Sequence, residues 1–257
     1  MTAPALQYVR TERRGRIAYI TLNRPEVLNA INPELLADLR IAFADFRDDP
    51  DAWVAILTGA GERAFCAGWD LKWHAGDEAA SRGLRPSPSP LSDCWKPVIA
   101  AVNGYAVGGG MELALDCDIV VAAEDARLGV PEPRRGQMTD TGAQRLPRIL
   151  PLKFAMGLLL TGKLIGAAEA HRIGLVNEVV PRAELMAGAE RWAAEILECA
   201  PLAVQATKQA ALQELTRVIA EGRARPYPLQ AALRESEDFV EGPRAFAAKR
   251  KPIWTGR

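Results

Sequence analysis

Short apolar runs alternate with helical patterns along the first 180 residues of the chain. Two β-rich stretches flank Gly15 within residues 7–22, which predicts a hairpin. Four further apolar runs are typical of buried parallel strands and lie at 53–57, 98–102, 119–121 and 175–180. Since helical segments separate these runs, the pattern predicts an α/β fold of βα units around a mostly parallel sheet.

One helix is predicted from its own start signals. Asn32 is a good N-cap, and Pro33 suits the first helical position. The apolar residues that follow recur on one helical face, at Leu35, Leu36, Leu39, Phe43 and Phe46. We therefore expect a helix that begins at residue 33 and buries this face.

The last part of the chain has no strand pattern. Helical, alanine-rich stretches cover 183–199 and 202–221, and Pro226 and Pro228 interrupt them before a final helical stretch. This predicts an α/β core over 1–198 and a helical oligomerisation subdomain over 199–257. Earlier, residues 76–92 are rich in Ser and Pro, which favours a long loop. That loop is either a mobile cover over a site or a tolerated surface insertion.

The amino-acid composition excludes several classes of protein. The 257 residues are 49% hydrophobic and 25% charged, as in an ordinary soluble domain. The 32 Lys and Arg residues balance 32 Asp and Glu residues, which argues against nucleic acid or an anionic membrane as partner. The chain has no run of apolar residues long enough to span a bilayer and no secretory pattern at its start, so we expect a cytoplasmic protein. Its four cysteines lack metal-ligand spacing and are expected to be reduced core thiols.

Familiar catalytic signatures are missing from the sequence. It contains no GxSxG, HExxH or Walker A motif, and no metal site is expected. Residues 59–64 superficially match a dinucleotide fingerprint. The apolar loop 65–69 follows them where that fingerprint needs a helix, which argues against a nucleotide site.

Three consecutive glycines, Gly108, Gly109 and Gly110, follow a buried apolar run and precede an apolar helix. Without Cβ atoms they let a ligand approach backbone N–H groups at a helix N-terminus, where negative charge is favoured. This describes half of an oxyanion hole. The alternative is close packing of the helix against a strand.

Two carboxylates lie in apolar surroundings. Glu112 is in the first turn of the helix after the glycines, and Glu132 lies in an apolar stretch beside a predicted strand end. Apolar surroundings raise the pKa of a carboxyl group, which suits general acid/base catalysis near neutral pH. The position of Glu112, taken alone, is explained by a favourable interaction of its carboxylate with the helix dipole. Together with the glycines, the pair favours catalysis.

Segments along nearly the whole chain resemble the crotonase, or enoyl-CoA hydratase/isomerase, superfamily. The matching segments are 20–30, 64–72, 103–113, 144–148, 160–162, 167–170, 174–177 and 241–250. The resemblance implies a spiral of βα units with a C-terminal helical trimerisation subdomain. It further implies homotrimers or homohexamers and an acyl-CoA thioester substrate.

The resemblance also implies roles for single residues. The backbone N–H groups of Trp69 and Gly109 would form the oxyanion hole, and Glu112 and Glu132 would be the catalytic pair. The remaining coenzyme A and substrate contacts would come from Val27, Leu28, Ala67, Asp70, Leu71 and Lys72, beside Trp69 and Gly109. The implied reaction is hydration of an enoyl-CoA without a cofactor, coenzyme A being part of the substrate. Alternatives are an isomerase, a specialised dehydratase, and a non-catalytic thioester-binding or RNA-binding member of the fold.

Asp140 departs from the usual family pattern, which has a small residue there. Carnitinyl-CoA dehydratases carry an Asp at the matching position and keep both glutamates, and the chain resembles them at 67–72 and 145–151 as well. Asp140 would then recognise a polar or cationic acyl chain. The alternative is an N-cap for the helix predicted to follow.

Overall fold

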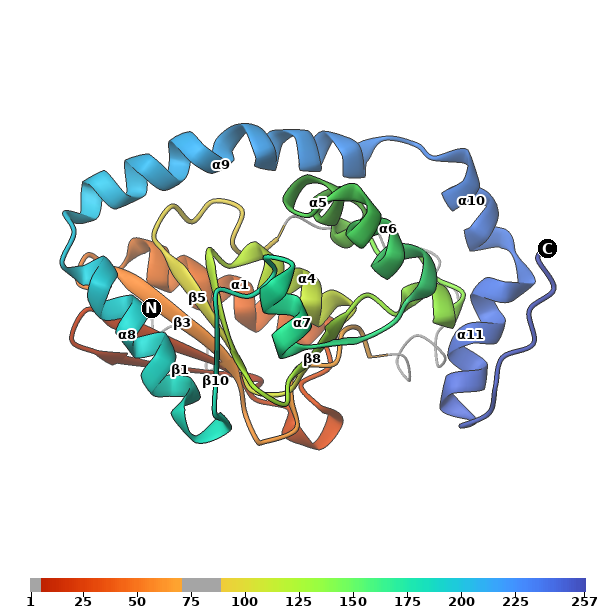
Figure 1. Ribbon diagram of the computed structural model, residues 1–257, viewed down its shortest axis with the longest axis horizontal. Helices are drawn as coiled ribbons and strands as arrows, with labels where there is room; N and C mark the ends of the chain where they lie inside the picture. Colours follow the sequence, from red (N-terminus) through yellow and green to blue (C-terminus); the bar gives the residue numbers. More distant parts are fainter. Residues whose placement is uncertain (1–5, 71–88) are drawn as a thin grey trace.

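The computed structural model describes residues 6–70 and 89–257, and two sheets organise this part of the chain (Figure 1). The larger sheet has the order β1 (Val9–Arg14), β2 (Ile17–Leu22), β3 (Val54–Gly59), β5 (Val98–Val102), β7 (Ile119–Ala123) and β10 (Glu178–Val180). β1 and β2 form the predicted antiparallel hairpin, and every other neighbouring pair is parallel. β3 and β5 are almost wholly buried, as their continuous apolar runs predict.

One strand is shorter than its apolar run. The sequence predicts a strand over 175–180, whereas β10 begins only at Glu178. Leu175 and Val176 are buried but belong to a turn, because Gly174 has φ +85° and the Leu175 N–H donates to the carbonyl of Ala170. Burial, not strand pairing, explains these two apolar residues.

A second sheet lies beside the first and was not predicted. Its order is β4 (Ala64–Cys66), β6 (Tyr105–Val107), β8 (Arg127–Gly129) and β9 (Ile165–Gly166). Strands of two or three residues are too short to show a period in the sequence. Since β4, β6 and β8 are parallel, the loops that leave them emerge at one edge of this sheet.

Helices cover both faces of the larger sheet. α1 (Pro33–Asp48) begins as predicted, with the Asn32 side chain accepting a hydrogen bond from the Leu35 N–H at 2.9 Å. Four of its five predicted face residues are buried, and Leu36 is only half-buried. α8 (Leu185–Leu197) packs on the opposite side, against apolar residues of β3, β5 and β7.

The remaining helices form the C-terminal part and the region before it. They are α4 (Gly109–Asp116), α5 (Thr141–Ile149), α6 (Leu152–Thr161), α7 (Ala167–Arg172), α9 (Pro201–Ala224), α10 (Pro228–Glu235) and α11 (Glu237–Ala247), with short helical turns η1 (Pro25–Val27), η2 (Glu132–Arg135) and η3 (Arg182–Glu184). Figure 1 shows α9 arching over the α/β part, after which α10 and α11 descend on one side. Contacts join α9 to α5 and α11 to η2. The expected boundary at 198/199 falls between α8 and α9.

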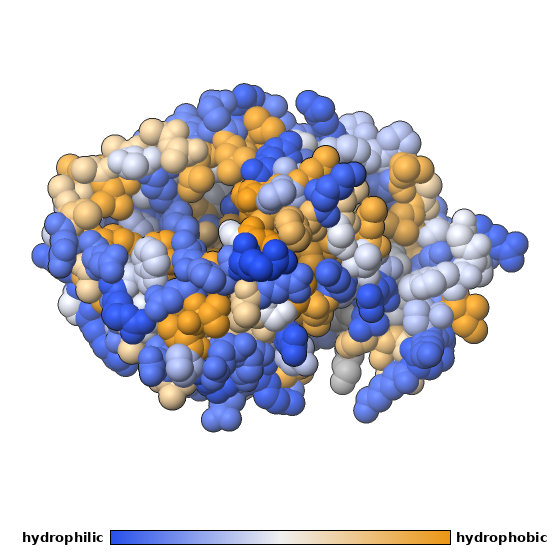
Figure 2. All heavy atoms as spheres, in the orientation of Figure 1, coloured by the Kyte–Doolittle hydropathy of each residue, from blue (hydrophilic) through white to orange (hydrophobic). Residues whose placement is uncertain are grey.

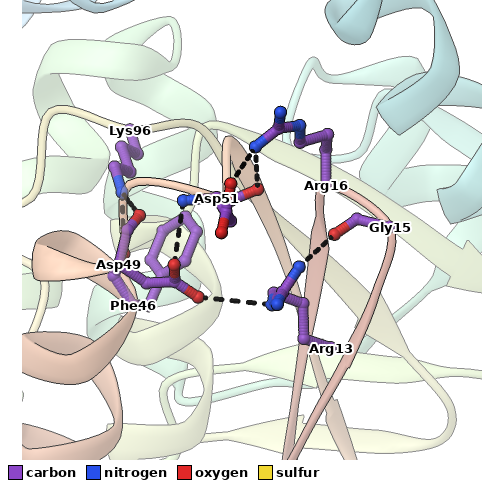
Figure 3. A network of polar contacts seen from close by, with 7 residues as sticks. All are labelled: Arg13, Gly15, Arg16, Phe46, Asp49, Asp51 and Lys96. Carbon is purple, nitrogen blue, oxygen red and sulfur yellow. Dashed lines mark hydrogen bonds and ion pairs between the residues drawn. The ribbon is translucent and has the colours of Figure 1, made fainter.

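A polar network fixes the end of α1 at the amino ends of β3 and β5 (Figure 3). The Lys96 ammonium donates to the carbonyls of Phe46 at 2.9 Å and Asp49 at 2.6 Å. The Asp49 carboxylate in turn pairs with Arg13 at 3.4 Å, beside the turn of the hairpin. This network joins three segments that are far apart in the sequence.

The cysteine prediction is right for three residues and wrong for one. Cys66, Cys94 and Cys117 are buried free thiols, whereas Cys199 is a free thiol exposed just after the end of α8. Apolar character at a helix end does not ensure burial, because the packed face has already ended there. Within residues 6–70 and 89–257, no helix is both long and apolar enough to cross a bilayer.

Candidate active site

Two glycine-containing loops meet at the edge of the smaller sheet. Gly68 follows β4 with φ +84°, and Gly108 follows β6 with φ +58°. A Cβ atom on Gly68 would lie 2.7 Å from the carbonyl oxygen of Val107 and 3.2 Å from the backbone nitrogen of Gly109. Glycine is therefore required at position 68, both for its backbone conformation and for the approach of the two loops.

Both predicted oxyanion donors lie where these loops meet. Gly109 is the first residue of α4, so its N–H has no carbonyl partner within the helix. Ile31 bonds to Gly68 and Asp70 on either side of Trp69, which points the Trp69 N–H away from Ile31. A Cβ atom on Gly109 would lie 3.3 Å from the Trp69 ring.

Gly110 has a different role from its neighbours. A Cβ atom there would lie 2.1 Å from the carbonyl oxygen of Cys66, so Gly110 serves the close packing of α4 on β4. The close-packing interpretation therefore applies at Gly110, whereas the oxyanion role of Gly109 stays a prediction.

Glu112 is held by the N-terminal end of α5. Its Oε1 accepts a hydrogen bond from the Thr139 hydroxyl at 2.7 Å and from the Gly142 N–H at 2.8 Å. A side chain on Gly142 would collide with the Thr139 hydroxyl, 2.4 Å from its Cβ. Burial raises the pKa of Glu112, whereas the two hydrogen bonds oppose this rise because they stabilise the carboxylate.

Glu132 is the first residue of η2, after β8. Its Oε1 would lie 3.1 Å from a Cβ atom on Gly108, so the carboxyl group reaches the glycine loop. Its Oε2 is buried without a hydrogen-bond partner among the described residues. Burial, followed by the negative charge of Glu112, raises the pKa of Glu132 to about 8.

The two carboxyl groups therefore differ in the protonation that each favours. Glu112, with two donors, is the partner suited to hold the negative charge. Glu132, buried and without a donor on Oε2, keeps its proton at neutral pH. Two carboxyl groups whose surroundings separate their proton affinities are suited to act as base and acid.

Four of the predicted coenzyme A contacts come together beside this pair of loops. Leu28 has φ +58° at the end of η1, and its carbonyl accepts a hydrogen bond from the Ala67 N–H at 3.0 Å. Asp70 pairs with Arg24 at 3.4 Å, which ties its loop to the segment containing Val27. Leu71 and Lys72, also predicted contacts, lie outside the described residues.

The left-handed backbone of the turn at Leu28 is stabilised by Asn29, which also has positive φ. The buried Asn29 side chain donates to the carbonyls of Ala60 at 3.0 Å and Ala64 at 2.8 Å. Non-glycine residues persist in this conformation where their surroundings hold them.

Asp140 occupies the N-cap position of α5, but its side chain does not cap the helix. It instead accepts hydrogen bonds from the Arg223 side chain of α9, at 3.0 Å from Nε and 2.6 Å from Nη2. The N-cap interpretation of this side chain is therefore wrong. A cation on another helix competes successfully for the carboxylate.

Sequence reasoning missed Thr139, Gly142 and Arg223. The Thr- and Asp-containing start of a helix is readable at 139–142, but nothing local indicates that a distant glutamate accepts hydrogen bonds there. Arg223 lies 83 residues from its partner, so only the fold connects them. Beside them, a cavity of about 680 Å³ between α9, α5 and the segment 89–95 includes Thr141 and Arg223 in its wall.

Comparison with known proteins places this geometry in a family. The model of the enoyl-CoA hydratase/isomerase family matches residues 12–257. The chain belongs to this family. Its crotonase-type α/β fold and its place among lyase-type enzymes accord with the expectation from the sequence.

Several members of the family are similar over nearly their whole length. The (E)-benzylidenesuccinyl-CoA hydratase of Thauera aromatica is 44% identical over 253 residues, covering 96% of this chain and 99% of that protein. The carnitinyl-CoA dehydratase of Escherichia coli K12 is 44% identical over 257 residues, covering 95% and 97%. The crystal structure of a carnitinyl-CoA hydratase from Mycobacterium avium has a TM-score of 0.82 at 40% identity, covering 98% and 99%.

Proposed function

We propose that this protein is an enoyl-CoA hydratase, which adds water reversibly and syn across the α,β double bond of an acyl-CoA thioester. The observation that carries the proposal is the pair Glu112 and Glu132, with separated proton affinities, beside the N-terminus of α4. Membership of the family and the hydratases and dehydratases among its similar members support the same reaction.

The proposed reaction begins with the thioester carbonyl oxygen between the N–H groups of Trp69 and Gly109. The Glu112 carboxylate removes a proton from water as the water oxygen adds to Cβ. Glu132 donates its proton to Cα, and the charge that develops on the thioester oxygen as an enolate is stabilised by the two N–H groups. Afterwards Glu112 carries a proton and Glu132 does not, so one proton transfer between them restores the starting state.

The contribution of each group to the reaction rate can be estimated to an order of magnitude. One positioned donor to an oxyanion lowers the barrier by about 2.7–4 kcal/mol. One general acid or base contributes about 10²–10⁴ in rate. Because these groups supply all the proton transfers and the charge stabilisation, we propose that the reaction needs no metal or further cofactor.

The reverse reaction uses the same groups with their roles exchanged, so a specialised dehydratase is the second candidate. Two of the similar proteins are named carnitinyl-CoA dehydratase or hydratase, which favours this candidate over others. An isomerase needs only one carboxyl group to move a proton between carbons, so the presence of both disfavours it. A non-catalytic binder has no use for a buried, unpartnered carboxyl oxygen, which costs stability.

We further propose a homotrimer or homohexamer in the cytoplasm. Large apolar side chains are exposed on α6, α9 and α10, namely Leu152, Phe154, Leu160, Leu202 and Leu229. Figure 2 shows apolar residues along the first half of α9. Such exposed apolar residues favour contact with another subunit. We also propose that residues 199–257 form the subdomain that makes this contact.

Hydration of crotonyl-CoA tests the proposal through loss of the enoyl-thioester absorbance. The wild type should turn over, and Glu132→Gln should lower kcat by about 10²–10⁴, because Gln cannot give a proton to Cα. Glu214→Gln is the matched control, since Glu214 is exposed and pairs only with Arg217 among the contacts described. It should retain the wild-type kcat.

Two results would redirect or overturn the proposal. Binding of acyl-CoA without turnover of crotonyl-CoA, but with dehydration of a polar 3-hydroxyacyl-CoA, would favour the specialised dehydratase. Full activity in Glu132→Gln would remove Glu132 from the chemistry and overturn the proposed mechanism.

A further inference from the structure

The last turn of α9 docks on the N-terminal turn of α5. Arg223 gives two hydrogen bonds to Oδ2 of Asp140, and both side chains are largely shielded from water, 15% and 29% exposed. The preceding residue, Gly222, allows a close approach, because a Cβ atom there would lie 2.4 Å from the Gln144 side-chain oxygen. Packing and charge thus fix the same two helical turns to each other.

The turn that Arg223 fixes is also the turn that holds Glu112. Thr139 immediately precedes Asp140, and Gly142 follows it by two residues. Both donate hydrogen bonds to the same oxygen of Glu112. The ion pair therefore anchors the middle of a segment whose two ends position the glutamate.

We propose that Arg223 is a positioning residue for the hydration reaction, acting through Asp140 to hold the 139–142 turn and with it the Glu112 carboxylate. The inference rests on the proposed function of Glu112 as base. It also gives Asp140 an anchoring role, because its charge is already compensated by Arg223. The Asp140 carboxylate is therefore paired with Arg223, rather than being an unpaired carboxylate that could bind a cationic acyl chain.

Within residues 6–70 and 89–257, the charges that act on Glu112 come from three elements. Asp116 lies on α4 and pairs with Arg145 of α5 at 2.7 Å. Asp140 lies at the start of α5, and Glu132 lies in η2; the negative charges of Asp140 and Asp116 raise the pKa of Glu112. Arg223 supplies the positive charge that compensates Asp140.

These charges predict that substitutions of Arg223 and of Asp140 shift the pKa of Glu112 in opposite directions. Arg223→Gln leaves the Asp140 charge uncompensated, which should raise the pKa of Glu112. Asp140→Asn removes the negative charge of Asp140 beside Glu112, which should lower the pKa of Glu112. A purely structural contact would shift this pKa in the same direction in both variants or in neither.

The test compares Arg223→Gln, Arg223→Lys, Asp140→Asn and the double variant, with Arg217→Gln as matched control. Arg217 lies on the same helix but pairs with Glu214 and Glu221, at the surface. We expect Arg223→Gln to lower kcat for crotonyl-CoA by up to about 10²-fold, since small misplacements of a catalytic group have effects of this size. Arg223→Lys should restore part of kcat, and Arg217→Gln should leave it unchanged.

Because Arg223 also lines the cavity, the Michaelis constant distinguishes positioning from direct contact with substrate. A positioning role changes kcat and leaves KM near the wild-type value, whereas a change confined to KM would overturn the inference. Titration of the ¹³C-labelled Glu112 carboxyl, assigned through Glu112→Gln, gives the pKa without any substrate. Equal pKa values in wild type, Arg223→Gln and Asp140→Asn would also overturn it.

Failure of this inference and failure of the proposed function are distinguishable. An active wild type whose kcat and Glu112 pKa are insensitive to Arg223→Gln contradicts only the role of Arg223. A wild type inactive on enoyl thioesters contradicts the function, while the titration still reports whether Asp140 and Arg223 act on Glu112. Thermal unfolding identifies a variant that fails to fold, in which case Asp140→Asn, which keeps a hydrogen-bond acceptor, decides the question.

Discussion

Two polar regions of this protein are built in opposite ways. Around Lys96, at the amino ends of β3 and β5, the ammonium meets two carbonyls at the end of α1 (Figure 3). Around Glu132, beside the glycine loops, a carboxyl oxygen is buried without a partner among the described residues. The first region satisfies its polar groups, and the second keeps one unsatisfied.

The physical chemistry of the two regions explains the difference. Burial lowers the pKa of Lys96, and the nearby acidic groups of Cys94, Asp49 and Asp48 oppose this shift. The two carbonyls accept hydrogen bonds from the ammonium. Burial and a neighbouring anion both raise the pKa of Glu132. Polar groups that serve the fold are hydrogen-bonded, and a strongly perturbed, unpartnered one indicates a reactive site.

Among the variants that compare these two regions, removal of the hydroxyl that supports Glu112 should have the largest effect on kcat. Thr139→Val keeps the shape of the side chain but deletes the 2.7 Å hydrogen bond to the carboxylate. A hydrogen bond to a charged group contributes about 1.5–3 kcal/mol, so kcat should fall by about 10–100-fold and the pKa of Glu112 should rise. Steady-state kinetics with Thr139→Ser as control would check this, and equal rates in Val and Ser variants would contradict it.

Lys96→Met should show the reverse behaviour, with lower stability and unchanged kcat. The substitution leaves the carbonyls of Phe46 and Asp49 without their charged donor, so the free energy of unfolding should fall by about 1.5–3 kcal/mol. Arg13→Gln is the control in the same network, where the exposed pair with Asp49 contributes at most about 1 kcal/mol. Urea unfolding measures the loss of stability in both variants. A large loss of kcat in Lys96→Met would contradict the claim that the Lys96 region serves stability and not catalysis.

A further prediction concerns how the free energy of unfolding depends on pH. Because the pKa of folded Glu132 is raised from 4.5 to about 8, the folded state binds its proton more tightly than the unfolded state. The resulting stabilisation is complete below pH 4.5 and is lost as the pH rises to about 8. Glu132→Gln should therefore have a flatter free energy of unfolding over this range. An unchanged slope in urea titrations at several pH values would contradict the assignment.

The larger sheet could be predicted from the sequence because its strands are long enough to show a pattern. The hairpin around Gly15 and the helix that begins at Pro33 carry explicit local signals, and both occur as expected. The smaller sheet could not be predicted, since β4, β6, β8 and β9 have two or three residues each. Their position depends on pairing partners about 20 to 40 residues away.

The candidate site likewise contains residues that could be predicted from the sequence and residues that could not. The glycine run and the two glutamates stand out in the sequence because a helix start and apolar neighbours give them a physical context. The groups that make the proton affinities of Glu112 and Glu132 differ do not stand out in the sequence. Thr139 and Gly142 are far from Glu112 along the chain and contact it only in the folded structure. The partner of Asp140 is similarly invisible, and the local N-cap signal there indicates an interaction that the side chain does not make.

The most direct test of this account is the titration of the Glu132 carboxyl itself. Carbon-13 labelling of glutamate side chains, with Glu132→Gln to assign the signal, would give its pKa in the free protein. We predict a midpoint near 8, with the carboxyl protonated at neutral pH. A midpoint near 4.5 would show an ordinary ionised carboxylate, and Glu132 could not then be the proton donor at neutral pH.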